Sequence, residues 1–84
     1  MKTVDPLYGL AAFLAVAAHE SFTGAAAALG LTRATVSAQV ADLEARLGVR
    51  LLHRSTRAVR LTPAGQAFRE RLADLPDRVD AAER

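Results

Sequence analysis

The stretch from residue 31 to residue 47, LTRATVSAQVADLEARL, carries side chains that could bind hydrogen-bonding edges. If the stretch is a helix, the short and polar side chains of its first half lie opposite an apolar face. A solvated helix surface usually carries Glu and Lys. Here the outward face has a single charge among hydroxyl, amide and methyl groups, on Arg33, Thr35, Ser37, Ala38 and Gln39. Such groups suit the base edges of a DNA major groove.

Each of these side chains has a possible partner on double-stranded DNA. Arg33 is placed to donate to a base edge, guanine above all, or to a phosphate, and Gln39 suits adenine. Ser37 can bond a base or a phosphate, whereas Thr35 and Ala38 offer methyl groups to thymine. The alternative for Arg33 and for Ser37 is an ordinary solvated surface residue.

Local signals predict a helix over residues 33–47. Thr32 is an N-cap residue type, and Gly48 can adopt the left-handed conformation that ends a helix. Spacings of four, three and four residues place one apolar stripe on the inward face, namely Val36, Val40, Leu43 and Leu47.

A shorter helix is expected directly before this one. Thr23 can cap it, residues 24–29 are rich in Ala, and Gly30 ends it. Phe22 stands where a hydrophobic staple would pack. Two helices joined by a glycine turn form the helix-turn-helix pattern, whose second helix can enter a major groove. Thr23 and Thr32 would then lie at helix N-termini that attract phosphate. The alternative is that they serve as caps alone, and the two roles are compatible.

A further helix is expected near the start of the chain. Asp5 and Pro6 signal its first turn, and it should run to about His19. Its expected inward face consists of Leu7, Leu10, Leu14 and Ala17, with Phe13 alongside.

Residues 49–62 change from a helical to a strand-like pattern. Residues 51–53 and 59–61 flank a basic segment, which predicts a two-stranded wing over 51–61. Val59 and Leu61 should face inward and Arg60 outward. Such a hairpin is marginal alone and must pack on the helices. Arg54 is expected to hold the base of the wing or to contact a phosphate.

Thr62 followed by Pro63 starts a last helix that should extend toward residue 84. Pro76 should kink or break it, because an interior proline cannot donate to the preceding turn. Apolar residues recur at heptad spacing and predict a homodimer interface, or else packing of the helix on its own domain: Phe68, Leu72, Leu75 and Val79, followed by Ala82.

Composition limits the class of protein. The 84 residues suit one small domain, and 51% of them are hydrophobic, above the level of a disordered chain. The absence of Cys excludes disulfides and thiolate metal sites. No apolar run could span a bilayer, and Asp5 and Pro6 interrupt any signal peptide. His19 and His53 lack metal-ligand spacing, and no nucleophile pattern or phosphate-binding loop is present, so we expect no enzyme activity, metal or cofactor.

Positive charge is concentrated in the middle of the chain. The net charge is only +2, but residues 33–60 hold six arginines against two acids, hence +4, and the remainder carries −2. This distribution is typical of a nucleic-acid partner.

Several motifs can be taken together. They are FLAVA at 13–17, SFT at 21–23, AA at 25–26, LT at 31–32, VS at 36–37, Gln39, LE at 43–44, LGVRLL at 47–52, Arg54, TR at 56–57, LT at 61–62 and AG at 64–65. As a set, and over nearly the whole chain, they resemble the N-terminal DNA-binding domain of LysR-type transcriptional regulators.

The resemblance implies a mainly α fold. A winged helix-turn-helix of three helices and a two-stranded wing would occupy residues 1–62, and residues 63–84 would form a linker helix that dimerises. It also implies a homodimer on an imperfect inverted repeat of double-stranded DNA, with Arg57 reaching into the minor groove. The chain departs from the family at Arg33-Ala34, where Gln-Pro is common, and at Ala38, where many members have a basic residue. Both departures lie on the face expected to contact DNA.

Members of the family also carry a C-terminal effector-binding domain, through which a small-molecule effector would act. It is absent here, so we expect an excised domain or a short stand-alone relative. The expected location is the bacterial cytoplasm, in association with the nucleoid and with no membrane partner. The alternative function is a protein-interaction or dimerisation module without specific DNA readout. The arginines between residues 50 and 60 disfavour it, because dimerisation does not require them.

Overall fold

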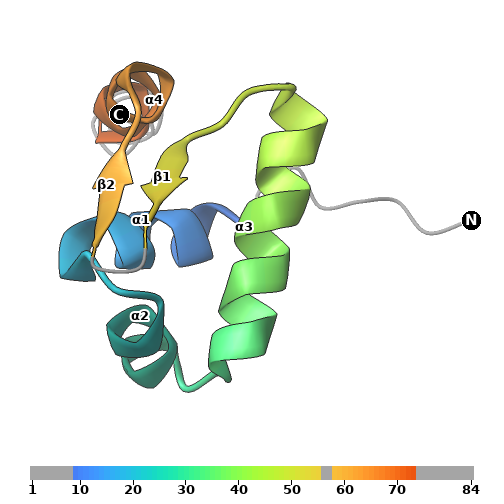
Figure 1. The fold of residues 1–84 in the computed structure, drawn as a ribbon, viewed down its shortest axis with the longest axis vertical. Coiled ribbons are helices and arrows are strands. Elements are labelled where there is room, and N and C mark those ends of the chain that lie inside the picture. Colours follow the sequence, from blue (N-terminus) through green and yellow to red (C-terminus); the bar gives the residue numbers. More distant parts are fainter. Residues whose placement is uncertain (1–8, 56–57, 74–84) are drawn as a thin grey trace, which may run out of the picture.

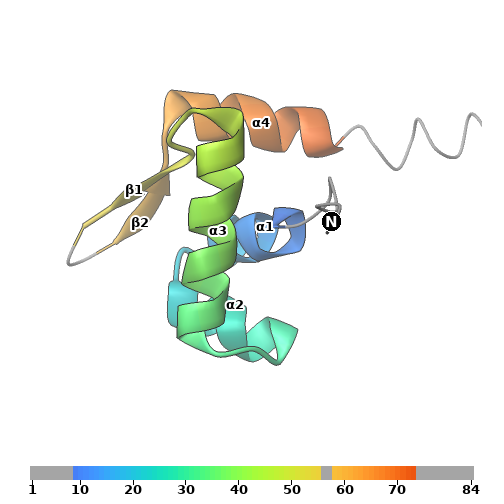
Figure 2. The ribbon, with the colours of Figure 1, turned by 90° about the vertical axis from the view of Figure 1, so that its right-hand side faces the viewer.

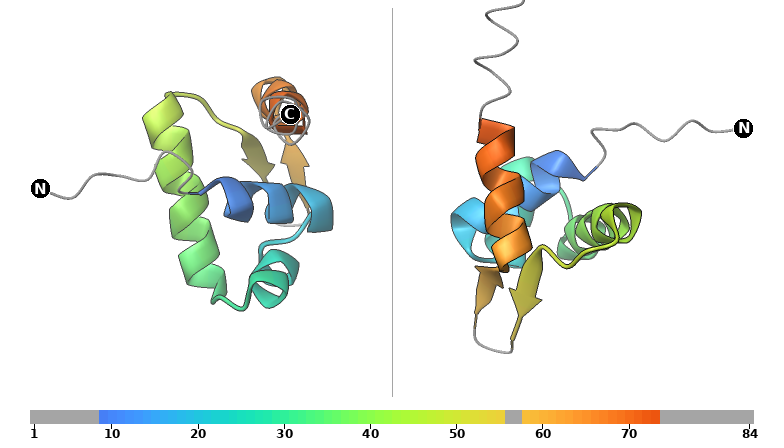
Figure 3. Two further views of the ribbon diagram at one scale, coloured as in Figure 1. Left: turned by 180° about the vertical axis from the view of Figure 1, so that it is seen from behind. Right: turned by 90° about the horizontal axis from the view of Figure 1, so that it is seen from above.

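The computed structural model describes residues 9–55 and 58–73, which form four helices and a two-stranded antiparallel sheet (Figure 1). In chain order the elements are α1 (Leu10–His19), α2 (Phe22–Leu29), α3 (Arg33–Leu47), β1 (Leu52–Arg54), β2 (Val59–Leu61) and α4 (Pro63–Ala73). α2 and α4 lie at opposite ends of the domain with α1 between them, and the hairpin projects from one side (Figures 2 and 3). This confirms the mainly α fold with a two-stranded wing. None of the helices described is both long and apolar enough to cross a membrane.

α2 and α3 form the predicted helix-turn-helix. Gly30 ends α2 in the left-handed conformation, with φ 68°, and its N–H donates to the last turn of α2. Thr32 caps α3 as predicted, because its Oγ1 accepts from the Thr35 N–H at 3.1 Å. Gly48 ends α3 with φ 71°. The turn chemistry predicted from the sequence is therefore confirmed at three of the four ends of these helices.

The start of α2 differs from the prediction. The N-cap is Ser21, whose Oγ accepts from the Gly24 N–H at 2.9 Å. Thr23 is not the cap but an exposed residue of the first turn. Phe22 is a core residue rather than a staple. Ser21 and Thr23 are both capping types, and burial of Phe22 in the first turn selects the earlier one.

α1 begins later than predicted. Gly9 precedes it with φ 90°, a left-handed conformation that interrupts any helix continuing from residue 6. A Cβ at Gly9 would lie 2.8 Å from the carbonyl oxygen of Gln39, so glycine allows α1 to approach α3 closely. The predicted start at Asp5 and Pro6 lies outside the described residues.

The core lies where α1, α2, α3 and the wing meet. α3 contributes its predicted stripe except for Leu47, which is 43% exposed at the helix end. The predicted inward face of α1 is right in part: Leu10 packs against the core and Phe13 is fully buried, but Leu14 is 38% exposed. Leu7 lies outside the described residues. The predicted face followed the leucines, whereas the buried face centres on Phe13. The buried hydrophobic residues are Ala12, Phe13, Val16, Phe22, Ala25, Ala26, Val36, Val40, Leu43, Leu51 and Leu52.

The wing has the predicted alternation. β1 and β2 pair with Leu52 opposite Leu61. Leu52 is buried, Val59 and Leu61 are half-buried against the core, and Arg60 is exposed. The hairpin thus gains from the helices the support that an isolated two-stranded sheet lacks.

α4 begins at Pro63 as predicted and is anchored at its first turn. The Thr62 hydroxyl accepts from the Gly65 N–H at 2.9 Å and donates to the Arg50 carbonyl at 2.6 Å. A Cβ at Gly65 would overlap the carbonyl of Leu51. Glycine is therefore required for α4 to pack against the chain that enters β1.

The first half of the predicted dimer seam packs within the domain. Phe68 and Leu72 are half-buried against the core, and the Phe68 ring centroid lies 5.6 Å from that of Phe13. The alternative of packing on the domain body is thus realised for these two residues. Leu75, Val79 and the expected kink at Pro76 lie outside the described residues, and dimerisation stays a prediction, as does the division at residue 62.

Candidate nucleic-acid interface

The predicted contact residues of α3 occupy the first half of its outward face. Val36 and Val40 hold the opposite face in the core, which fixes how the helix is turned. Arg33, Ala34, Thr35 and Ala38 are exposed, and Ser37 and Gln39 are half-buried. The helix therefore presents all six predicted residues with at least part of their surface accessible.

Two hydroxyl groups are linked at the start of α3. The Thr32 O–H donates to Thr35 Oγ1 at 2.8 Å while Thr32 Oγ1 accepts the Thr35 N–H. Both residues are exposed. The pair restrains the Thr35 side chain and leaves its hydroxyl hydrogen for an acceptor outside the domain.

An interface groove of about 510 Å³ separates the start of α3 from the wing. Its lining residues come from α2, α3 and the hairpin, and are Phe22, Arg33, Ala34, Ser37, Arg54, Ser55 and Val59. Among the described residues, the groove is lined by two arginines and two hydroxyl groups and by no acid, and donors of these kinds suit a phosphate. The fold thus brings the predicted residues Arg33, Ser37 and Arg54 to one groove from separate elements.

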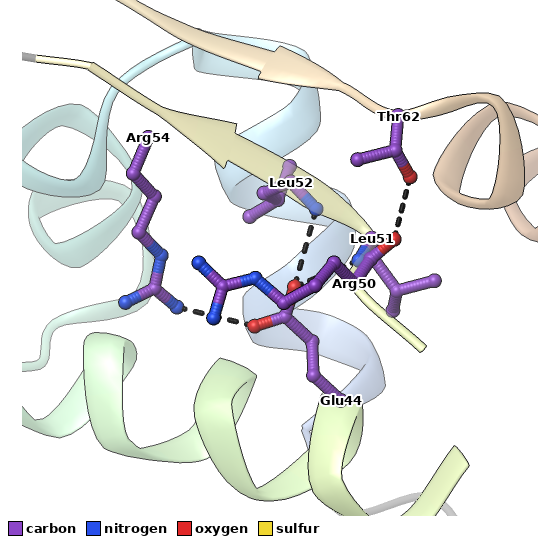
Figure 4. A network of polar contacts seen from close by, with 6 residues as sticks. All are labelled: Glu44, Arg50, Leu51, Leu52, Arg54 and Thr62. Carbon is purple, nitrogen blue, oxygen red and sulfur yellow. Dashed lines mark hydrogen bonds and ion pairs between the residues drawn. The ribbon is translucent and has the colours of Figure 1, made fainter. Parts of the chain in front are cut away.

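Glu44 was not among the residues predicted for the site, yet it joins α3 to the wing (Figure 4). It is 6% exposed, and its Oε2 accepts from the backbone N–H groups of Leu51 and Leu52 at 2.7 and 3.2 Å. A sequence signal was present, because Glu44 follows Val36 and Val40 at helical spacing. A lone carboxylate on an apolar stripe requires buried partners.

Arg54 takes one of the two roles expected for it. Its Nη2 lies 3.4 Å from Glu44 Oε1, and its guanidinium lies 4.9 Å from the centroid of the Phe22 ring. It therefore ties the end of β1 to both α3 and α2, which is the expected role at the base of the wing. About a third of the side chain, 32%, stays exposed, and Arg54 is one of the residues that line the interface groove.

Hydrogen bonds join Ser55 and Ala58, the two residues that flank residues 56–57 in the wing. Ser55 Oγ accepts from the Ala58 N–H and donates to the Ala58 carbonyl, each at 3.0 Å. The Ser55 N–H donates to the same carbonyl at 3.1 Å. Arg57, the predicted minor-groove residue, lies outside the described residues.

Comparisons with known proteins agree on one family. A model of the bacterial regulatory helix-turn-helix proteins of the lysR family matches residues 7–66. An HTH-type transcriptional repressor of Pseudomonas aeruginosa is 48% identical over 80 residues, which cover 95% of this chain and 25% of that protein. A probable hydrogen peroxide-inducible genes activator of Mycobacterium xenopi is 48% identical over 81 residues, covering 95% of this chain and 43% of that protein. The chain thus spans less than half the length of these relatives.

Solved structures show the same likeness. The crystal structure of the BenM DNA-binding domain with catB site 1 DNA superposes with a TM-score of 0.79 at 38% identity, covering 88% of this chain and 82% of that one. The CbnR DNA-binding domain in complex with DNA gives a TM-score of 0.74 at 41% identity, covering 90% and 95%. With its helix-turn-helix, wing and family match, this chain belongs to the lysR family of bacterial regulatory helix-turn-helix proteins.

Proposed function

We propose that this chain is the sequence-specific DNA-binding part of a LysR-type transcriptional regulator. In this proposal α3 enters the major groove, the wing over residues 51–61 approaches the minor groove, and two copies bind an inverted repeat. The observation that carries it is the hydrogen-bonding face of α3 beside the arginine-lined interface groove. The BenM and CbnR domains, which this chain resembles in fold and sequence, were solved as complexes with DNA, and this supports DNA as the partner.

Base recognition is assigned to the first half of α3. Arg33 would donate to a guanine or a phosphate, and Gln39 would pair with adenine. Ala34 and Ala38 are short enough to let the helix approach the bases, and the methyl groups of Ala38 and Thr35 suit thymine. Ser37, at the edge of the interface groove, would bond a base or the adjoining phosphate.

Phosphate and minor-groove contacts are assigned to the surroundings of α3. Thr23 lies in the first turn of α2 and Thr32 is the N-cap of α3, and backbone N–H groups at helix N-termini favour an anion. Arg54 lines the interface groove with a partly exposed side chain and would contact a phosphate there. Arg57 would enter the minor groove, whose potential is most negative where A/T-rich sequence narrows it.

Dimerisation is part of the proposed mechanism. Two copies joined through Phe68, Leu72, Leu75 and Val79 would set their α3 helices about 34 Å apart, one turn of DNA. One domain offers few contacts, so we expect the second half-site to supply much of the affinity. The partial exposure of Phe68 and Leu72 leaves surface for a second copy.

The cellular setting follows from the proposed DNA partner. A regulator of this kind would act in the bacterial cytoplasm on the nucleoid. Any small-molecule effector would act, in this proposal, through a C-terminal effector-binding domain of the kind expected for the family.

The decisive experiment is selection from a random duplex library with the purified chain at moderate salt. We expect enrichment of an inverted repeat whose half-sites are about one DNA turn apart. Binding without enrichment that vanishes as salt rises would leave only a non-specific electrostatic attraction. That result would overturn specific recognition and favour the protein-interaction module.

A further inference from the structure

We propose that Glu44 and Arg54 are positioning residues that set the angle of the wing relative to α3. One carboxylate then determines whether major-groove and minor-groove contacts form in the same register. This inference rests on the proposed DNA-binding function. It adds that Glu44 and Arg54 would contribute to sequence specificity without contacting a base.

The wing cannot hold its own direction. Its strands have three residues each, and such a hairpin is marginal in isolation. Leu52 holds β1 in the core, and Val59 and Leu61 pack β2 against it. Apolar contacts are not directional, so a defined angle of the strands over α3 requires directional polar contacts as well.

Glu44 supplies attachments at both ends of β1 from a single side chain of α3. Its Oε2 accepts the N–H groups of Leu51 and Leu52 where the strand begins, and its Oε1 meets the Arg54 guanidinium where the strand ends. Figure 4 shows the carboxylate between these two partners. Because the carboxylate has only two oxygens, both attachments are satisfied together only at one orientation of the strand over α3.

Arg54 adds a third element to this arrangement. Its guanidinium is held between Glu44 and the ring of Phe22, at the first turn of α2. A planar guanidinium can donate at its edge and stack with its face at the same time, whereas a lysine ammonium cannot. Through Arg54 the wing thus contacts both helices of the helix-turn-helix.

Arg54→Lys tests this role, since it keeps the charge but cannot maintain both contacts. Affinity is measured for three duplexes. The first is the selected duplex, the second has altered base pairs in the half-site that α3 would contact, and the third has G/C in place of the A/T flanks that the wing would contact. For the wild-type chain we expect about tenfold preferences in both comparisons. The flank preference is the ratio of affinities for A/T and G/C flanks, and the half-site preference is the ratio for intact and altered half-sites. In folded Arg54→Lys, the flank preference should fall to within about twofold, whereas the half-site preference should stay about tenfold.

Two further variants make the test specific. Glu44→Gln retains an acceptor for the backbone but loses the ion pair, and should change the flank preference in the same direction. Arg60→Lys is the matched control, because Arg60 lies on the exposed face of β2, and both preferences should stay as in the wild type. All affinities are measured where circular dichroism shows the variants folded.

Some outcomes would overturn the inference. They are an unchanged flank preference in folded Arg54→Lys, a loss of both preferences together, and a wild-type chain that discriminates half-sites but not flanks. Failure of the proposed function itself looks different, because the wild-type chain would then discriminate no duplex at all.

Discussion

At the scale of single residues, arginines and glycines have different roles in this domain. Arg33 and Arg54 bring positive charge to the interface groove. The glycines allow backbone segments to adopt left-handed conformations or to pack closely, as at Gly30 and Gly65. Changes in the first group should alter DNA binding, and changes in the second should alter stability.

Arg57→Ala should weaken binding, most of all to duplexes with A/T-rich flanks, and make the salt dependence less steep. Removing one positive charge from the DNA interface lowers the slope of log K against log salt by about one. Titrations of fluorescent duplex at several salt concentrations measure it, with Arg69→Ala on α4 as a control. An unchanged slope would remove Arg57 from the proposed contacts.

Gly65→Ala should destabilise the domain more than Gly30→Ala. At Gly65 the new Cβ would overlap the Leu51 carbonyl, for which we expect a cost of about 3 kcal/mol. At Gly30 the Cβ meets nothing within 4 Å, and only the left-handed φ of 68° is unfavourable, at about 1 kcal/mol. Urea unfolding of the two variants gives the comparison, and equal losses would contradict the close packing of α4.

At the scale of elements, α3 combines two faces with different requirements. Its inward face packs Val36, Val40 and Leu43 into the core, and its outward face holds the proposed base contacts. The same substitution placed on the two faces should therefore have different consequences.

Val40→Asp should unfold the domain. The residue is fully buried, and an unpaired charge there costs about 3–5 kcal/mol, which is comparable with the whole stability of a small domain. Ala38→Asp, exposed on the other face, should keep the helical circular dichroism but lose DNA binding through repulsion from phosphate. Native helicity in Val40→Asp would refute the inward placement of this face.

At the scale of the whole molecule, α4 connects the domain core to the proposed dimer. Phe68 packs against Phe13, so the first half of the seam is tied to the domain. The seam residues further along the chain, Leu75 and Val79, are the ones left to test the dimer without disturbing that contact.

Val79→Asp should shift the chain toward the monomer, because it places a charge on the predicted apolar seam. Affinity for the inverted repeat should fall at least about tenfold, while affinity for a single half-site stays the same. Ala81→Asp, next to the seam but off its heptad positions, is the matched control. Sedimentation velocity reports the oligomeric state, and an unchanged dimer in Val79→Asp would exclude this seam.

The sequence by itself determined the features whose causes are local. The cap at Thr32, the turn at Gly30, the end of α3 at Gly48 and the alternation of the wing each depend on neighbouring residues, and all are present. The outward face of α3 could be predicted for the same reason, because helical spacing alone separates it from the apolar stripe.

Tertiary structure decided the features that depend on segments distant in the chain. Ser21 rather than Thr23 caps α2 because Phe22 is buried, and α1 starts at Leu10 because Gly9 packs against α3. Glu44 became part of the site only when folding brought β1 to α3, since a carboxylate on an apolar stripe does not reveal its partners. Those partners are backbone N–H groups seven and eight residues away and an arginine ten residues away, and no helical or strand periodicity relates them.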